Sequence, residues 1–208
     1  WISGLGLMAV GMVLQLGALS LAPLIVVQPI GAIALVITSL LNAKVTKTPM
    51  NRGSIIAVAL CTVGIALFVG MASSVAHASV LTDTDVSTIL FILLGLLVVF
   101  AALFFTSGRS AKPLTFIIGA GVLYGFVATL AKVVIQRIYQ AQFDWLTILC
   151  LIALIAAVVL GGWFVQNAYA SGPPDLVIAG LTVIDPMVAV TIAIAILGEA
   201  KAATLPVV

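Results

Sequence analysis

Residues 22–32 read APLIVVQPIGA, an apolar stretch that contains two prolines, Pro23 and Pro29, and one polar residue, Gln28. The residues on both sides of it are almost wholly apolar. Proline is tolerated at the start of a helix, where its missing N–H would be unpaired anyway, but it disturbs a helix interior. The stretch therefore predicts a helix that begins at Pro23, bends at Pro29 and turns Gln28 toward the protein interior.

The composition of the whole chain places this helix in a membrane. Of the 208 residues, 64% are hydrophobic and only 7% are charged, whereas a soluble domain carries about a quarter charged residues. Such a chain cannot cover a surface that faces water, so its outer surface must face lipid. In lipid the backbone polar groups must be paired internally, which leaves helices or a closed barrel. The apolar runs are about twenty residues long and do not alternate, so the prediction is an all-α, polytopic membrane protein.

The apolar runs give the expected membrane segments, about 7–8 in number. They lie at 1–20, 22–43, 53–71, 87–106, 113–136, 145–170 and 174–198, and an eighth begins near Thr204. Because Trp1 already lies within the first run, we expect a fragment of a longer helical bundle.

The charged loops predict the orientation. Residues 44–52 contain three basic residues and residues 107–112 contain two, whereas residues 72–86 contain two aspartates and no lysine or arginine. The positive-inside rule puts loops 44–52 and 107–112 in the cytoplasm and residues 72–86 outside. Arg137, beside an outside loop, speaks against this orientation. The predicted location is the plasma (inner) membrane, crossed several times.

Signals for other functions are missing from the sequence. It has no Gly-rich phosphate loop, no Ser-His-Asp arrangement and no pair of catalytic carboxylates, so we expect no enzyme and no cofactor. Cys61 and Cys150 lie inside apolar runs and, without clustered histidines, give no metal-site spacing. The net charge of +2 follows from the membrane topology and predicts no nucleic-acid partner. The expected surroundings are the lipid bilayer.

The sequence contains a weak internal repeat. ALSLAPLIVVQ at 18–28 resembles AYASGPPDLVI at 168–178, so that Pro23 pairs with Pro173. By the predicted orientation the helices that follow these stretches run in opposite directions, which is the signature of an inverted-repeat transporter. We therefore expect first-repeat helices at 1–71, a central helix with its linking loops at 72–112, and second-repeat helices at 113–208.

The first 32 residues resemble the second and third membrane segments of the NIPA-type magnesium transporters, which belong to the drug/metabolite transporter (DMT, EamA) superfamily. The most specific part is the APxxxVxPxGA block at 22–32, and Leu197-Gly198-Glu199 matches the ending of the wider superfamily. The resemblance implies an inverted-repeat, DMT-type bundle of about 9–10 transmembrane helices. One helix would be absent before Trp1 and the last would be truncated. It also implies alternating-access transport of a small solute or cation, with Mg²⁺ as one candidate and a site between the repeats.

Two departures from that family bear on magnesium. The family has an acidic residue directly after the glycine that is Gly11 here, where this chain has Met12, and another near the position of Thr48. A hard divalent cation prefers carboxylate oxygens. The losses leave the metal unknown and make an organic or lipid-derived substrate comparably well supported.

Polar residues within the membrane segments are the candidate substrate-binding residues. Asp185 should lie about 17 Å along its helix, near the middle of the ~30 Å hydrocarbon core, where a carboxylate is costly. Pro186 follows it and, like Pro29, is expected to break its helix and free a backbone carbonyl. If the repeats face each other, Asp185 shares one cavity with other polar residues of the membrane segments. The proposed substrate-binding residues are Asp185, Gln28, Gln15, Lys132 and Tyr124.

Several of these residues also have a purely structural interpretation. Gln28 can cross-link two helices by one hydrogen bond, and Lys132 can extend its ammonium group to the membrane interface. Glu199, at a helix end, is expected at the interface in a structural role. Gly121 and Gly125 predict a close helix contact, which suits either static packing or sliding.

Two classes of function stay open. The first is a transporter, including an exporter or flippase of a lipid-linked or organic metabolite. The second is a non-transporting subunit or scaffold of a larger membrane complex. A dimer is left open as well.

Overall fold

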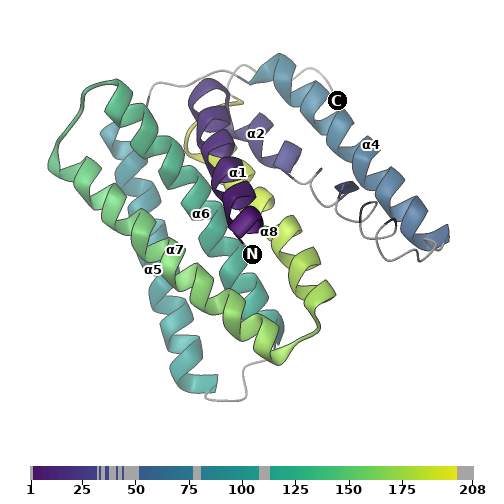
Figure 1. Cartoon of the computed structure of the whole chain (residues 1–208). Helices are drawn as coiled ribbons and strands as arrows, with labels where there is room; N and C mark the ends of the chain where they lie inside the picture. Colours follow the sequence, from purple (N-terminus) through teal and green to yellow (C-terminus); the bar gives the residue numbers. More distant parts are fainter. Residues whose placement is uncertain are drawn as a thin grey trace.

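The computed structural model of the chain is a bundle of packed helices (Figure 1). It describes residues 2–31, 52–76, 81–107 and 113–200, together with the isolated residues 33, 36, 37, 41 and 44. Within these residues every regular element is an α-helix. The helices are α1 (Ile2–Leu21), α2 (Leu24–Gly31), α4 (Arg52–Val75), α5 (Asp83–Ser107), α6 (Pro113–Tyr139), α7 (Trp145–Ser171) and α8 (Pro174–Ala195).

These elements confirm the prediction of an all-helical chain suited to a membrane. Four helices among the described residues are long and apolar enough to cross a bilayer, at 83–102, 113–139, 145–171 and 176–195. Shorter apolar helical stretches lie at Ala9–Leu21 and Ala59–Val75. The run near Thr204 and most of the two basic loops lie outside the described residues, and the size of the full bundle stays a prediction.

Successive helices alternate in direction, with α1, α4, α6 and α8 pointing toward one end of the bundle and α2, α5 and α7 toward the other (Figure 1). Contacts at one end agree with this reading. Near the end of α6, Arg137 forms ion pairs with Asp83 at the start of α5 and with Asp144 just before α7. The alternation has the pattern expected for a multi-pass membrane protein. Which end faces the cytoplasm stays a prediction.

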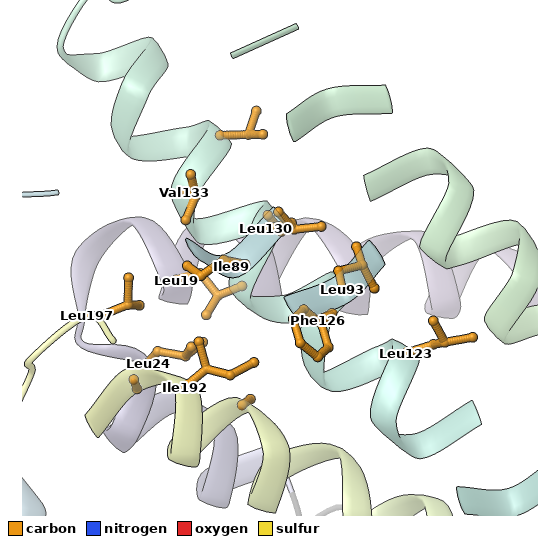
Figure 2. Packing of buried hydrophobic residues seen from close by; sticks show 14 of the residues in the cluster. Leu19, Leu24, Ile89, Leu93, Leu123, Phe126, Leu130, Val133, Ile192 and Leu197 are labelled. Atoms are coloured by element: carbon orange, nitrogen blue, oxygen red, sulfur yellow. The ribbon is translucent and has the colours of Figure 1, made fainter. Parts of the chain in front are cut away.

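The packing centres on α6, which contacts both α7 and α8 extensively. Buried apolar side chains from α1, α2, α5, α6 and α8 meet in one core (Figure 2). Leu19, Leu24, Ile89, Phe126 and Ile192 are among them. In contrast, α4 packs against α2 at one side of the bundle (Figure 1). The outward faces of the helices carry large exposed apolar side chains, which suits a surface that faces lipid.

Two glycines of α6 allow α8 to approach closely. A methyl group added at Gly121 would lie 2.7 Å from Cβ of Ile184, and one at Gly125 would lie 2.7 Å from Cβ of Val188 and 3.0 Å from the carbonyl oxygen of Asp185. All three distances are shorter than a real side chain normally allows. The close contact predicted from Gly121-xxx-Gly125 is therefore confirmed, and its partner is the turn of α8 that carries Asp185.

The chain is interrupted twice in the same way, between α1 and α2 and between α7 and α8. The N–H groups of Ala22 and Gly172 each donate to the carbonyl four residues earlier, at 3.0 and 2.9 Å. The carbonyls of Pro23 and Pro173 then each accept from the residues three and four positions later, at 3.1 and 3.2 Å and at 3.1 and 3.3 Å. These matched breaks fall on the two stretches that resemble each other in sequence. The division into inverted repeats at 1–71 and 113–208, with a centre at 72–112, stays a prediction.

Candidate functional site

The break between α1 and α2 leaves two backbone groups without helical partners. The N–H of Val26 donates to the oxygen of Pro23 at 3.1 Å instead of to Ala22. The carbonyl of Ala22 therefore loses the donor that a continuous helix would supply. The N–H of Ile25, in the first turn of α2, likewise has no helical acceptor. Because unpaired backbone groups are costly in a buried setting, both need outside partners.

A buried ion pair supplies both partners. Nζ of Lys132 donates to the Ala22 oxygen at 2.8 Å and lies 2.9 Å from Oε1 of Glu199. Oε2 of Glu199 accepts from the Ile25 N–H at 2.9 Å. The side chains of Lys132 and Glu199 are only 4% and 1% exposed. The pair joins α6 and the segment after α8 to the α1–α2 break, and its extra hydrogen bonds are those that a buried pair requires.

This pairing bears on two expectations. Glu199 was expected at the membrane interface in a structural role; its side chain is almost fully buried in the protein, and its depth in the membrane stays a prediction. Lys132 does not extend its ammonium group outward, because that group is turned inward to the ion pair. Nor does it lie among the residues that line the cavity described next. The sequence signal that could have drawn attention to Glu199 was its place in the Leu-Gly-Glu ending.

A cavity of about 710 Å³ lies between α1, α2, α6, α7 and α8. Four of the five proposed substrate-binding residues line it, namely Gln15, Gln28, Tyr124 and Asp185. Pro186 and Thr182 line it as well. The rest of the wall is mostly aliphatic and includes Met12, Leu16, Leu19, Leu154, Val158 and Leu181. The structure thus gathers polar groups from α1, α2, α6 and α8 around one largely apolar space.

Asp185 stands out among these residues. It lies in the interior of α8, and its Oδ1 atom is buried with no hydrogen-bond partner among the described residues. Pro186 has no N–H, so the carbonyl of Thr182, four residues earlier, has no helical donor. Asp185 and the backbone carbonyl that lacks this donor therefore lie about one turn apart in α8. The Thr182 hydroxyl is already used, since it donates to the Ile178 oxygen at 2.8 Å.

The remaining polar lining residues come from three helices. Gln15 lies on an exposed part of α1, whereas Gln28 of α2 is 7% exposed. Tyr124 of α6 lines the same cavity as Asp185. Together with the Thr182 carbonyl, which lacks its donor at residue 186, these groups can accept hydrogen bonds from a ligand in the cavity.

The two predicted helix-breaking prolines meet at a second, smaller cavity of about 260 Å³. Pro29 and Pro186 line it together with Gly64, Ile65 and Phe68 of α4. Both prolines lie inside helices that continue past them, and the predicted breaks stay a prediction. The described side chains that line this cavity are all apolar, so they offer no polar recognition. The cavity does place the two weakened helical turns next to α4.

Arg137 holds three helix ends together at one end of the bundle. Its NH1 atom lies 2.8 Å from Oδ1 of Asp83 and its NH2 atom 2.8 Å from Oδ2 of Asp144. Its Nε atom donates to the Thr147 hydroxyl at 2.8 Å. The hydrogen bond from Arg137, followed by that from Thr147, lowers the pKa of the Asp144 carboxyl. In the sequence, Arg137 was the basic residue that did not fit the predicted orientation. In the structure, Asp83 and Asp144 compensate its positive charge.

Comparison of the chain with protein-family models, with curated proteins and with solved structures finds no match. The geometry above is therefore the basis for any functional assignment.

Proposed function

We propose that the chain is the membrane-spanning part of a transporter for a small solute or cation, with its substrate site in the cavity around Asp185. The observation that carries this proposal is the buried Oδ1 atom of Asp185, which lies in the interior of an apolar helix and has no hydrogen-bond partner in the part of the chain that the structure describes. A carboxylate at that depth costs at least ~2.5 kcal/mol, so a membrane protein keeps one there for a purpose.

The surroundings of Asp185 support the same proposal. Its cavity lies where the helices on either side of the two matched breaks meet, as expected for a carrier built from two similar units. Pro29 and Pro186 weaken two of the helices that line it or lie beside it. Helices weakened in this way can change shape during alternating access. The resemblance to the NIPA-type branch of the DMT superfamily points the same way.

Accessibility from both membrane faces tests the proposal. In the full chain carrying Cys61→Ala and Cys150→Ala, the variant Thr182→Cys places one thiol on the cavity wall. After reconstitution, an impermeant thiol reagent applied from either side of the bilayer is expected to modify it. The matched control Ile152→Cys, on an outward face, should not react from either side. A scaffold subunit predicts modification of Thr182→Cys from one side at most, and that result would reject transport by alternating access.

We also propose the orientation that the basic loops predict, with 44–52 and 107–112 in the cytoplasm of a cell whose plasma (inner) membrane holds the protein. Single cysteines at Thr48 and Ala78, in the chain without native cysteines, test it in intact cells. Labelling by an impermeant reagent is expected for Ala78→Cys and not for Thr48→Cys. The opposite pattern would reverse the orientation.

A further inference from the structure

We propose that the cavity around Asp185 binds an organic monocation, in which one ammonium group is carried on a compact apolar body. That the protein also carries this cation across the membrane rests on the transporter function proposed above. That the cavity binds the cation does not depend on that function. Three properties of the wall lead to this class of ligand: its charge, its hydrogen-bond acceptors and its apolar remainder.

The charge of the wall fits one positive charge. Among the described residues that line the cavity, Asp185 is the only carboxylate, and none of them is a lysine or an arginine. Lys132 is adjacent in sequence to the lining residue Ala131, but its ammonium group is bound to Glu199 and to the Ala22 oxygen. It therefore does not neutralise Asp185. A ligand with a single positive charge would compensate the carboxylate and leave the site neutral, which is the favoured state in a low dielectric.

The acceptors fit an ammonium group. A primary ammonium has three N–H donors and no acceptor. The Asp185 carboxylate and the Thr182 carbonyl freed by Pro186 lie in neighbouring turns of α8. The amide oxygens of Gln15 and Gln28 and the hydroxyl of Tyr124 come from the facing helices. The wall thus offers more acceptors than an ammonium needs.

The remainder of the wall does not suit a metal ion. The residues that the structure describes contain no group of three or more His, Cys, Asp or Glu side chains that could hold one. Mg²⁺ takes six oxygens in a nearly ideal octahedron and gives up its water reluctantly. Most of the wall is instead aliphatic, as in Leu154, Val158 and Leu181. A space of about 710 Å³ lies within the range of sites for small organic molecules.

Binding by the full chain in lipid nanodiscs tests the inference. The probes are 2-phenylethylammonium, its neutral counterpart 2-phenylethanol, and Mg²⁺, with thermal unfolding followed by tryptophan fluorescence. The ammonium probe is expected to raise the unfolding temperature in a saturable way. Asp185→Asn should weaken it about tenfold or more, because a charge-assisted hydrogen bond is lost. The control Asp85→Asn, in the first turn of α5 and not among the residues that line the cavity, should bind like the wild type. Equal stabilisation by the neutral alcohol, or by Mg²⁺ alone through Asp185, would overturn the proposal.

A second measurement covers the case in which Asp185→Asn folds poorly. In the chain without native cysteines, 2-phenylethylammonium should protect Thr182→Cys from a thiol reagent while 2-phenylethanol does not. Equal protection by both probes would overturn the inference.

Flux in proteoliposomes separates this inference from the function on which it rests. Binding of the ammonium without flux would reject transport and support the ligand class. If a neutral solute is carried, and neither the ammonium nor Asp185→Asn changes its flux, transport is supported and the ligand class is rejected.

Discussion

Nζ of Lys132 lies 2.9 Å from Oε1 of Glu199, and the two side chains are almost fully buried although 67 residues separate them in the chain. The two residues also complete the hydrogen bonding of the α1–α2 break. The Lys132 ammonium donates to the Ala22 carbonyl, and the Glu199 carboxylate accepts from the Ile25 N–H. Each charge matches the polarity of the backbone group it meets. The ion pair therefore fixes the break that Pro23 creates, and it does so beside the cavity wall, since Ala131 lines that wall.

Removing Lys132 alone should lower the stability of the protein far more than neutralising both members of the ion pair. Lys132→Met leaves the Glu199 carboxylate buried without its counter-charge and is expected to destabilise the protein by about 3–5 kcal/mol. In Lys132→Met/Glu199→Gln the neutral amide can still accept from the Ile25 N–H, so the loss should be clearly smaller. Unfolding in detergent titrations with SDS measures both. A double variant as unstable as the single one would contradict this account.

The Arg137 cluster should make stability depend on acid. Arg137 lowers the pKa of the Asp144 carboxyl in the folded protein. The ionised carboxylate therefore stabilises the fold fully at pH values above its unfolded pKa of about 3.9. That contribution is lost as the pH falls through the lower, folded pKa. Asp144→Asn keeps a side-chain oxygen that can cap α7 but loses the charge. The stability difference between wild type and Asp144→Asn should therefore shrink below about pH 4, as unfolding between pH 3 and 7 would measure. A difference that is constant with pH would argue against the ion pair.

The glycine contact between α6 and α8 should be sensitive to a single methyl group. Gly125→Ala would place its Cβ 2.7 Å from Cβ of Val188 and 3.0 Å from the backbone oxygen of Asp185, so α8 has to move. Overpacking of this kind costs about 1–3 kcal/mol. Gly162→Ala, on α7, meets nothing within 4 Å and is the matched control. Unfolding measurements on the two variants should separate them, and equal stabilities would mean that the helices are not held this closely.

The sequence predicted the helices better than the lateral neighbours of their polar residues, whose depth in the membrane stays a prediction. Depth follows from counting residues along an apolar run, because each residue of a helix rises by 1.5 Å. Asp185, Gln15, Gln28 and Tyr124 do line one cavity, although their role in binding stays a proposal. The choice of lateral partners depends on which helices touch, and a single sequence does not contain that information.

Two polar residues illustrate this limit. Lys132 was placed among the candidate ligands because nothing in the sequence indicated that Glu199 would be its partner. Arg137 was read as an orientation signal for the same reason, although Asp83 and Asp144 compensate its charge. Glu199 was assigned to the interface because it follows the last long apolar run, where a chain normally leaves the membrane. The break at Pro23 creates a need for a buried acceptor that becomes visible only in three dimensions.

Pro186 should matter for the site more than for the fold. In Pro186→Ala the new N–H can donate to the Thr182 carbonyl and complete the helical ladder of α8. The helix should become more stable, by roughly 1–3 kcal/mol if the surrounding packing adapts. The cavity would lose its free backbone carbonyl while Asp185 stays in place. We therefore expect Pro186→Ala to unfold at a higher temperature and to bind 2-phenylethylammonium less tightly.

Pro29→Ala is the matched comparison, because it repairs α2 and the carbonyl it affects belongs to Ile25, which does not line the larger cavity. It should stabilise its helix while leaving the affinity for the ammonium nearly unchanged. Titration of both variants in nanodiscs, with unfolding curves recorded in parallel, checks the pair of outcomes. If Pro186→Ala gains stability and keeps full affinity, the Thr182 carbonyl takes no part in the site. The ammonium would then have to be held by Asp185 and the side chains of the facing helices alone.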